Sequence, residues 1–266
     1  MSQTPSCAIV IPVWRETLSH TEQISFDRCL SVLGKRHPVI LATFPELDLK
    51  AYRDRAQACG SAYSVHLFGR ENFDGIHGYN VMMLSPAFYD AFRNYDYILI
   101  CQLDAYVFED RLAEWCGKGY DYVGGPVYAP NHLDLDLAPV GNGGFSLRRV
   151  SAFRQAVSAR LSPFARRKPN PYITWRKKCV YALMLACSGR SQRLRGFLSR
   201  WVPEDLFFSL ALQGTSAELH VPAPAEAVEF AIDLHPEIAF ARNGEDWRPF
   251  GWHQWHRFPQ YWDKLD

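Results

Sequence analysis

Apolar runs that predict strands alternate with mixed stretches that predict helices over the first hundred residues. The strand candidates are short and rich in β-forming residues, at residues 7–13, 38–44, 62–68 and 97–103. Runs of this length and composition are typical of strands buried on both faces of a sheet. The stretches that separate them read as helices, at residues 21–33, 48–59 and 78–94. This alternating order predicts a doubly wound α/β sheet.

The pattern becomes less regular in the second half of the chain. A short strand is predicted at 120–126, where it breaks at a Gly-Gly-Pro turn, and a loop is predicted at 131–139. Three glycines within 141–144 precede Phe145, where a strand resumes before a helix that begins near Ser151. Because glycine has no side chain, we expect this turn to let the backbone approach a ligand closely.

Composition indicates an ordinary globular chain. The 266 residues are 48% hydrophobic and 21% charged, which suits one α/β domain. The longest apolar candidate, 179–187, is far shorter than the ~20 residues of a spanning helix. The run at 7–13 is too short for a signal peptide and has no basic residues before it. The 7 cysteines are scattered without a C-x-x-C pair, which favours a reducing, cytoplasmic setting.

Charge is distributed unevenly along the chain. Residues 151–203 contain twelve Lys and Arg and no Asp or Glu. The whole chain has 29 basic and 28 acidic residues, so the remainder has 17 basic and 28 acidic residues and a net charge of −11. A basic segment therefore accompanies an acidic body, which disfavours a nucleic-acid surface.

The basic segment also carries an amphipathic helical pattern. An apolar stripe recurs at helical spacing, formed by Leu194, Phe197, Leu198 and Trp201. Most arginines of this stretch lie off the stripe. A basic helix of this kind either lies on an anionic lipid surface or packs its stripe onto the core of the domain, and both interpretations stay open.

Asp104 follows the strand predicted at 97–103 and is the first candidate for chemistry. In open α/β sheets, ligands bind outside the carboxyl ends of the strands. A carboxylate at this place is suited to hold a cation or a sugar hydroxyl. The alternative is a helix N-cap, because Glu109, Asp110 and the residues after them read as a helix start.

Two common nucleotide-binding motifs are absent from the sequence. The first predicted strand leads into Trp14, Arg15 and Glu16 rather than into G-x-G-x-x-G, and no G-x-x-x-x-G-K-[ST] follows elsewhere. A hydride-transfer enzyme and a P-loop kinase are therefore disfavoured.

Four blocks in chain order carry a resemblance to a known class: QLDAYVF at 102–108, GNGGFSLR at 141–148, EDLFF at 204–208 and PFGWH at 249–253. Together they resemble the GT-A glycosyltransferases, which use sugar nucleotides, and more narrowly the bacterial GT-A-like DUF5672 family. The resemblance implies an α/β, Rossmann-like mixed sheet flanked by helices, in a single domain with a basic helical insertion. Residues 1–108 would bind the nucleotide sugar. Residues 109–266, which include the basic segment 151–203, would bind the acceptor.

The resemblance also implies a divalent cation, Mn²⁺ or Mg²⁺, that neutralises the leaving diphosphate. GT-A enzymes hold it with Asp-x-Asp at the end of the fourth strand, where this chain has Gln102 and Asp104. Asp104 is then the remaining carboxylate ligand, and His253 is implied as the second ligand. The alternative for His253 is a histidine in an aromatic core with Trp252 and Trp255.

The acidic pair Glu204 and Asp205 is implied to be catalytic. Asp205 matches the base that takes the acceptor proton in an inverting transferase, and Glu204 would orient the acceptor hydroxyl. The alternative is that both are first-turn acids stabilised by the helix dipole. Further residues are expected around the donor nucleotide and the sugars: Pro12, Val13, Arg15, Tyr79, Asn80, Gln102, Asn142, Gly143 and Gly144.

The sequence thus predicts an inverting glycosyltransferase that uses a nucleoside-diphosphate sugar. We expect it in the cytoplasm, at the inner membrane face through 151–203, acting on a glycan or lipid-linked glycan in bacterial surface polysaccharide synthesis. Two other classes stay open. One is a non-catalytic sugar- or nucleotide-binding protein of the same fold, and the other is a metal-dependent hydrolase using Asp104, His253 and His256.

Overall fold

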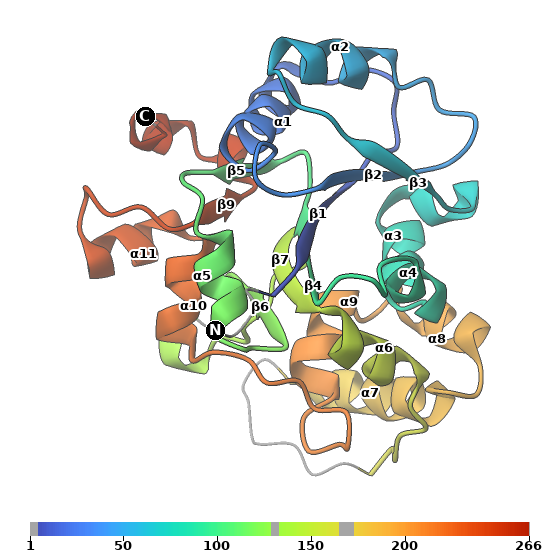
Figure 1. The fold of residues 1–266 in the computed structure, drawn as a ribbon. Helices are drawn as coiled ribbons and strands as arrows, with labels where there is room; N and C mark the ends of the chain where they lie inside the picture. Colours follow the sequence, from blue (N-terminus) through green and yellow to red (C-terminus); the bar gives the residue numbers. More distant parts are fainter. Residues whose placement is uncertain (1–4, 129–132, 165–172, 266) are drawn as a thin grey trace.

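A mixed six-stranded sheet organises the computed structural model, which describes residues 5–128, 133–164 and 173–265 (Figure 1). The strand order is β3-β2-β1-β4-β7-β6. The strands are β1 (Cys7–Pro12), β2 (Val39–Thr43), β3 (Ser64–Leu67), β4 (Tyr97–Cys101), β6 (Tyr122–Gly124) and β7 (Phe145–Arg149). The first four in chain order run parallel, whereas β7 pairs antiparallel with both β4 and β6. The predicted mixed α/β sheet is confirmed.

Strand β4 lies inside this sheet and is buried over its whole length. Its residues alternate between the two cores, with Ile98 and Ile100 on one face and Leu99 and Cys101 on the other. Burial on both faces explains why the strand reads as a continuous apolar run rather than as an alternating one.

Helices cover both faces of the sheet (Figure 1). The face of Leu99 packs against α1 (His20–Val32), α2 (Lys50–Ala58) and α5 (Leu112–Gly117). The face of Ile98 packs against α3 (Gly75–Met83), α4 (Pro86–Ala91), α6 (Val150–Ser158) and α7 (Trp175–Cys187). The one helix predicted at 78–94 is two, because Ser85 caps α4 and Pro86 cannot continue α3.

A second, three-stranded sheet brings the C-terminal part of the chain back to the end of β4. Its order is β5 (Ala105–Val107), β9 (Gly251–His253) and β8 (Ala231–Ile232). The register pairs Ala105 with His253. Asp104 therefore lies in the turn between β4 and β5, and the helix N-cap interpretation of Asp104 is wrong, since α5 begins only at Leu112.

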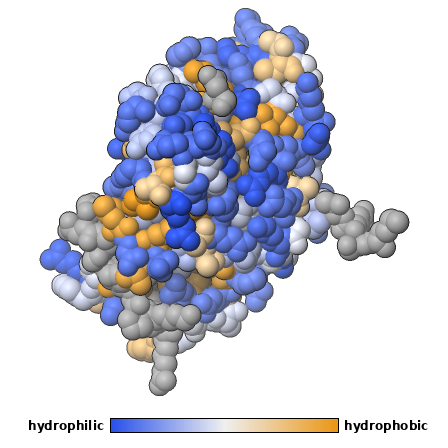
Figure 2. All heavy atoms as spheres, turned by 90° about the vertical axis from the view of Figure 1, so that its left-hand side faces the viewer, coloured by the Kyte–Doolittle hydropathy of each residue, from blue (hydrophilic) through white to orange (hydrophobic). Residues whose placement is uncertain are grey.

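The remaining segments connect these elements or follow them in the chain. They are a short 3₁₀ turn at Arg70–Phe73, another at Leu135–Leu137 within the predicted loop, α9 (Glu204–Leu206), a π-helical stretch at Phe207–Ala211, α10 (Pro224–Phe230), α11 (Pro236–Asn243) and two C-terminal 3₁₀ turns at Trp255–Arg257 and Pro259–Lys264. Figure 2 views the side that carries α10 and α11, where hydrophilic residues surround separate hydrophobic areas.

The basic segment contains α7 and α8 (Gln192–Leu198), which pack against each other. Its residues Arg166, Arg167 and Lys168 lie outside the described residues. In the predicted stripe Leu198 is buried, but Leu194, Phe197 and Trp201 are 48%, 47% and 53% exposed. Packing onto the core therefore accounts for Leu198 and leaves the other three side chains at the surface. Among the described helices, none is long and apolar enough to span a membrane.

Candidate active site

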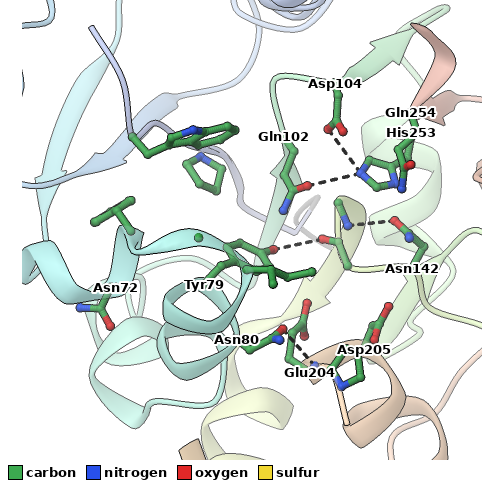
Figure 3. Close-up of a pocket in the computed structure, with 18 residues that line it drawn as sticks. Asn72, Tyr79, Asn80, Gln102, Asp104, Asn142, Glu204, Asp205, His253 and Gln254 are labelled. Carbon is green, nitrogen blue, oxygen red and sulfur yellow. Dashed lines mark hydrogen bonds and ion pairs between the residues drawn. The ribbon is translucent and has the colours of Figure 1, made fainter. Parts of the chain in front are cut away.

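A cavity of about 490 Å³ opens beyond the carboxyl ends of β1 and β4 (Figure 3). It collects residues from distant parts of the chain, as expected at the strand ends of an α/β sheet. Eleven of the residues singled out in the sequence line it: Pro12, Tyr79, Asn80, Gln102, Asp104, Asn142, Gly143, Gly144, Glu204, Asp205 and His253.

Val13 and Arg15 do not line the cavity. Val13 is buried in the core, and its backbone N–H donates to Ala42 at 2.9 Å. Arg15 forms an ion pair with Glu22, which belongs to the capping box of α1. The residue between them, Trp14, faces the cavity instead.

His253 is the centre of a polar cluster on one wall of the cavity. Its Nε2 lies 3.3 Å from Asp104 Oδ1 and 3.3 Å from Gln102 Oε1. Its Nδ1 lies 2.7 Å from Oδ1 of Asp233, a buried residue that follows β8. We call Asp104, His253 and Asp233 the histidine wall. His253 is thus held in place by two carboxylates rather than packed as an apolar core residue.

The two carboxylates set the protonation state of the histidine wall. Burial opposes a charged imidazole, but the hydrogen bonds and charges of Asp104 and Asp233 outweigh it and raise the pKa of His253 to about 10. Burial also opposes ionisation of Asp104, and the hydrogen bond and charge of His253 outweigh it, so the pKa of Asp104 is lowered. At neutral pH His253 is therefore protonated and pairs with the carboxylates on both sides of its ring.

The donor set at the histidine wall fits one half of a divalent-cation site. Asp104 and His253 both line the cavity with potential ligand atoms 3.3 Å apart, and Asp233 supports the far ring nitrogen of His253. Metal-binding histidines are commonly held in this way by a carboxylate. No cluster of three or more His, Cys, Asp or Glu in the described ranges could hold a metal alone. Oxygens of a bound ligand and water would have to complete the coordination.

A second wall, formed by Glu204 and Asp205 on α9, lies opposite the first (Figure 3). We call these two residues and Arg148 the carboxylate wall. Arg148 Nη2 lies 2.8 Å from Glu204 Oε1, and both side chains are almost fully buried. Arg148 Nη1 also donates to the Tyr89 hydroxyl at 2.9 Å. Glu204 Oε2 has no hydrogen-bond partner among the described residues.

Asp205 differs from Glu204 although the two are adjacent in the chain. Its Oδ1 accepts a hydrogen bond from the backbone N–H of Leu206 at 2.7 Å. Burial and the negative charge of Glu204 raise the pKa of Asp205 to about 7. Arg148 reaches Glu204 directly and only partly offsets this effect on Asp205. A carboxyl that titrates near neutral pH is suited to accept a proton.

The helix that carries the acidic pair is irregular. Three residues of α9 lead directly into the π-helical stretch Phe207–Ala211, and the Ser209 hydroxyl donates to the Asp205 carbonyl at 2.8 Å. π-Helical turns occur frequently at functional sites. Both acids do lie in a first helical turn, but the buried ion pair of Glu204 and the raised pKa of Asp205 exceed what a helix dipole alone explains.

Gly143 and Gly144 bring the two walls together. A Cβ on Gly143 would lie 2.2 Å from Glu204 Oε1, and a Cβ on Gly144 would lie 2.0 Å from His253 Nε2. The turn is held by Asn142, whose Oδ1 accepts from the Gly144 N–H at 2.9 Å. The missing side chains therefore make room for Glu204 and His253. The sequence alone predicted room for a ligand at this turn.

The family described as "Protein of unknown function (DUF5672)" matches residues 62–253, which is more than half of the chain. The chain belongs to the DUF5672 family. The matched stretch contains Asp104, Glu204 and Asp205 and ends at His253, so it includes residues from both walls. No curated protein matches the sequence.

Solved structures show the fold. Core-mannan synthase A (CmsA/Ktr4) from Aspergillus fumigatus, in a Mn/GDP form, is similar with a TM-score of 0.53 and 12% sequence identity over 82% of this chain and 71% of that chain. The mannosyltransferase Ktr4p from S. cerevisiae in complex with GDP gives a TM-score of 0.49 and 11% identity over 84% and 68% of the two chains. The first likeness confirms the predicted GT-A-like fold.

This DUF5672 chain also has site residues that the sequence did not single out. Trp14 and Ile76 stand exposed at the cavity, and Asn72, Phe73, Gly75, Pro203 and Gln254 complete its lining. Arg148 had a signal, a charged residue in the apolar strand β7. Asp233 had none in its local sequence. His256, expected for a hydrolase, is not among the lining residues.

Proposed function

We propose that this protein is a glycosyltransferase that moves a sugar from a nucleoside-diphosphate sugar to a hydroxyl group of a glycan. One observation carries the proposal. Asp205, a carboxyl with a pKa of about 7, lies across a cavity of about 490 Å³ from the charged pair Asp104 and His253. The GT-A-like fold supports it.

The histidine wall is assigned to the diphosphate of the donor. The protonated imidazole of His253 can donate to a phosphate oxygen, and the amide of Gln102 lies beside it. A divalent cation would instead take the place of the Nε2 proton, since an imidazole that binds a metal is neutral. Held by Asp104 and His253, the cation would neutralise the charge that develops on the leaving diphosphate. Trp14, at the cavity mouth, offers a flat apolar surface for a ring of the donor.

The carboxylate wall is assigned to the acceptor. Asp205 takes the proton of the acceptor hydroxyl while that oxygen forms its bond to the anomeric carbon. The bond from the anomeric carbon to the diphosphate breaks, and its electron pair leaves with the nucleoside diphosphate. Attack from the face opposite the diphosphate inverts the anomeric centre. Glu204, fixed by Arg148, is assigned to orienting the acceptor hydroxyl.

The similar A. fumigatus structure suggests which ligands to test first. Core-mannan synthase A was solved in a Mn/GDP form, so GDP-linked sugars and Mn²⁺ head the panel for this chain. A hexose as the transferred group, and a surface polysaccharide as the product, are parts of the same proposal.

A thermal-shift panel of nucleotide sugars, each with and without Mn²⁺, tests the proposal. A ligand that binds the folded state raises the unfolding temperature by an amount set by its affinity. We expect a nucleotide sugar to raise it and the matching free sugar not to. Consumption of that donor should then require an acceptor, and NMR of the product should show the inverted anomer.

Three results would contradict the proposal in different ways. If no nucleotide sugar stabilises the protein with any divalent metal, the donor assignment fails. Donor breakdown that is faster in water alone than with any acceptor indicates a hydrolase. Binding without turnover across a broad panel of acceptors indicates a binding protein. A product with retained anomeric configuration contradicts only the inverting mechanism and leaves the transfer reaction standing.

A further inference from the structure

Helix α8 and the turn after it, residues 199–201, present an apolar and basic face at the surface. Leu194, Phe197 and Trp201 are exposed, and Arg193 and Arg200 are exposed beside them. These five residues, which we call the α8 face, follow helical spacing from 193 to 201. The Phe197 and Trp201 rings are 5.1 Å apart, and the Arg200 guanidinium lies 5.3 Å from the Phe197 ring.

The opposite side of α8 is anchored to the protein. Leu198 is buried, and a Cβ on Gly196 would lie 3.1 Å from Val81 of α3. Arg195 is buried as well and donates to the Leu84 carbonyl. Because this inner side is fixed on α3, α8 cannot rotate to bury its outer aromatic residues.

The chain segment that carries the α8 face has charge of one sign. Residues 173–203 contain seven Lys or Arg and no Asp or Glu. Helix α7, which packs against α8, also has two exposed apolar side chains, Trp175 and Leu183. The headgroup region of a bilayer accepts both aromatic rings and arginine.

We propose that the α8 face docks on an anionic lipid bilayer. Arg193 and Arg200 meet lipid phosphates while Leu194, Phe197 and Trp201 enter the headgroup boundary. The strong net negative charge of the rest of the chain keeps other faces away from the same surface. This inference does not depend on the transfer reaction.

Docking in this orientation places the cavity next to the membrane. Trp201 is two residues before Pro203, which lines the cavity. Helix α3, on which α8 packs, contributes Gly75 and Ile76 to the same cavity, and Ile76 is strongly exposed at its mouth. An acceptor carried by a lipid would thus reach the carboxylate wall without leaving the bilayer surface.

Flotation of the full chain with lipid vesicles tests the proposal. We expect binding to phosphatidylcholine vesicles that contain phosphatidylglycerol, weak binding to phosphatidylcholine alone, and a loss of binding as salt rises. The double variant Arg193→Glu/Arg200→Glu should weaken partitioning at least about tenfold, since each basic residue near an anionic surface contributes roughly fivefold. Phe197→Ser/Trp201→Ser should weaken it by a similar factor.

The matched control is Arg53→Glu/Arg242→Glu, which makes the same change of charge at exposed positions on α2 and α11. It should bind the vesicles nearly as well as the wild type, and all variants should keep the wild-type unfolding temperature. Equal losses in the control and in the α8 variant would overturn the proposal. So would equal binding to neutral and anionic vesicles, or tighter binding to RNA than to vesicles. Donor binding in the cavity is measured separately, so failure here leaves the proposed transfer standing.

Discussion

Each wall of the cavity combines two carboxylates with one cationic side chain, and the walls differ in where the positive charge lies. In the histidine wall, His253 stands between Asp104 and Asp233 and forms an ion pair with each. In the carboxylate wall, Arg148 forms its ion pair with Glu204 rather than with Asp205. The pKa of Asp104 is consequently lowered, whereas that of Asp205 is raised to about 7. The position of the cationic side chain thus decides the state of each carboxyl. A carboxyl paired with it stays ionised and can hold a ligand, whereas one without it titrates near neutral pH and can accept a proton.

The largest expected effect separates the two walls by removing the base. Asp205→Asn keeps the size and the hydrogen bond from Leu206 but cannot accept a proton. Turnover should fall by ~10²–10⁴-fold, the usual contribution of a positioned base, with donor affinity nearly unchanged. Steady-state kinetics and calorimetric titration of the donor measure the two quantities.

Asp54→Asn on the exposed surface of α2 is the matched control and should leave both quantities unchanged. If Asp205→Asn loses donor affinity and keeps its turnover, the separate roles of the two walls are contradicted.

A smaller effect is expected when the histidine wall loses a charge. Asp104→Asn removes a ligand charge and uncouples His253, so donor affinity in the presence of Mn²⁺ should fall by roughly 10–100-fold, the value of a lost charged hydrogen bond. Chelation of divalent cations should remove most of the difference between wild type and variant. Titration of the donor with and without Mn²⁺ measures this affinity. An unchanged affinity in the variant would contradict the assignment of the diphosphate to the histidine wall.

The two glycines allow each wall to be disturbed by a single methyl group. Gly143→Ala presses on Glu204, and Gly144→Ala presses on His253. Overpacking of this kind costs about 1–3 kcal/mol of folding free energy unless the neighbouring side chain moves away. We expect Gly143→Ala to lower turnover and Gly144→Ala to lower donor affinity, both read by the titrations and kinetics described above. Identical effects of the two substitutions would show that the walls do not act separately.

The smallest effect concerns stability. Because the folded-state pKa of Asp205 is raised, its carboxyl favours the folded state at low pH, and this contribution is lost as pH rises from about 4 to about 7. The full shift corresponds to about 4 kcal/mol, but Asp205 is only partly buried and solvent screens part of it. Asp205→Asn should therefore raise the free energy of unfolding by about 1–2 kcal/mol at a pH of about 8 and leave it unchanged near pH 4. Urea denaturation at the two pH values measures it. A loss of stability at the higher pH would mean that the surroundings of Asp205 do not disfavour its ionised form.

Much of the fold and the site could be predicted because the deciding signals are local. The apolar run of β4 identifies a strand buried on both faces, and Asp104 follows directly at its carboxyl end. The block that contains Glu204 and Asp205 is likewise contiguous in the chain. Ser85 and Pro86 also carried a local signal, the break between α3 and α4, which the helical periodicity across 78–94 obscured.

The rest depends on contacts between distant residues. Asp233 contacts His253 because β8 pairs with β9, and no sequence pattern around Asp233 predicts that pairing. Arg148 meets Glu204 across 56 positions of sequence. Arg15 has the right residue type and position for a phosphate ligand, but Glu22 in the first turn of α1 captures it. Side-chain partners of this kind are decided by the packing of helices on the sheet.

The pH dependence of transfer tests the central claim most directly. With a donor identified by the thermal-shift panel and a saturating acceptor, turnover is measured from acid to alkaline pH for the wild type and for Asp205→Asn. If Asp205 is the base, wild-type turnover rises about tenfold per pH unit in acid and levels off near a pH of about 7, where its carboxyl is ionised, and this rise is absent from the variant. A wild-type profile that is flat through pH 7, or the same rise in the variant, would contradict the assignment of Asp205 as the base.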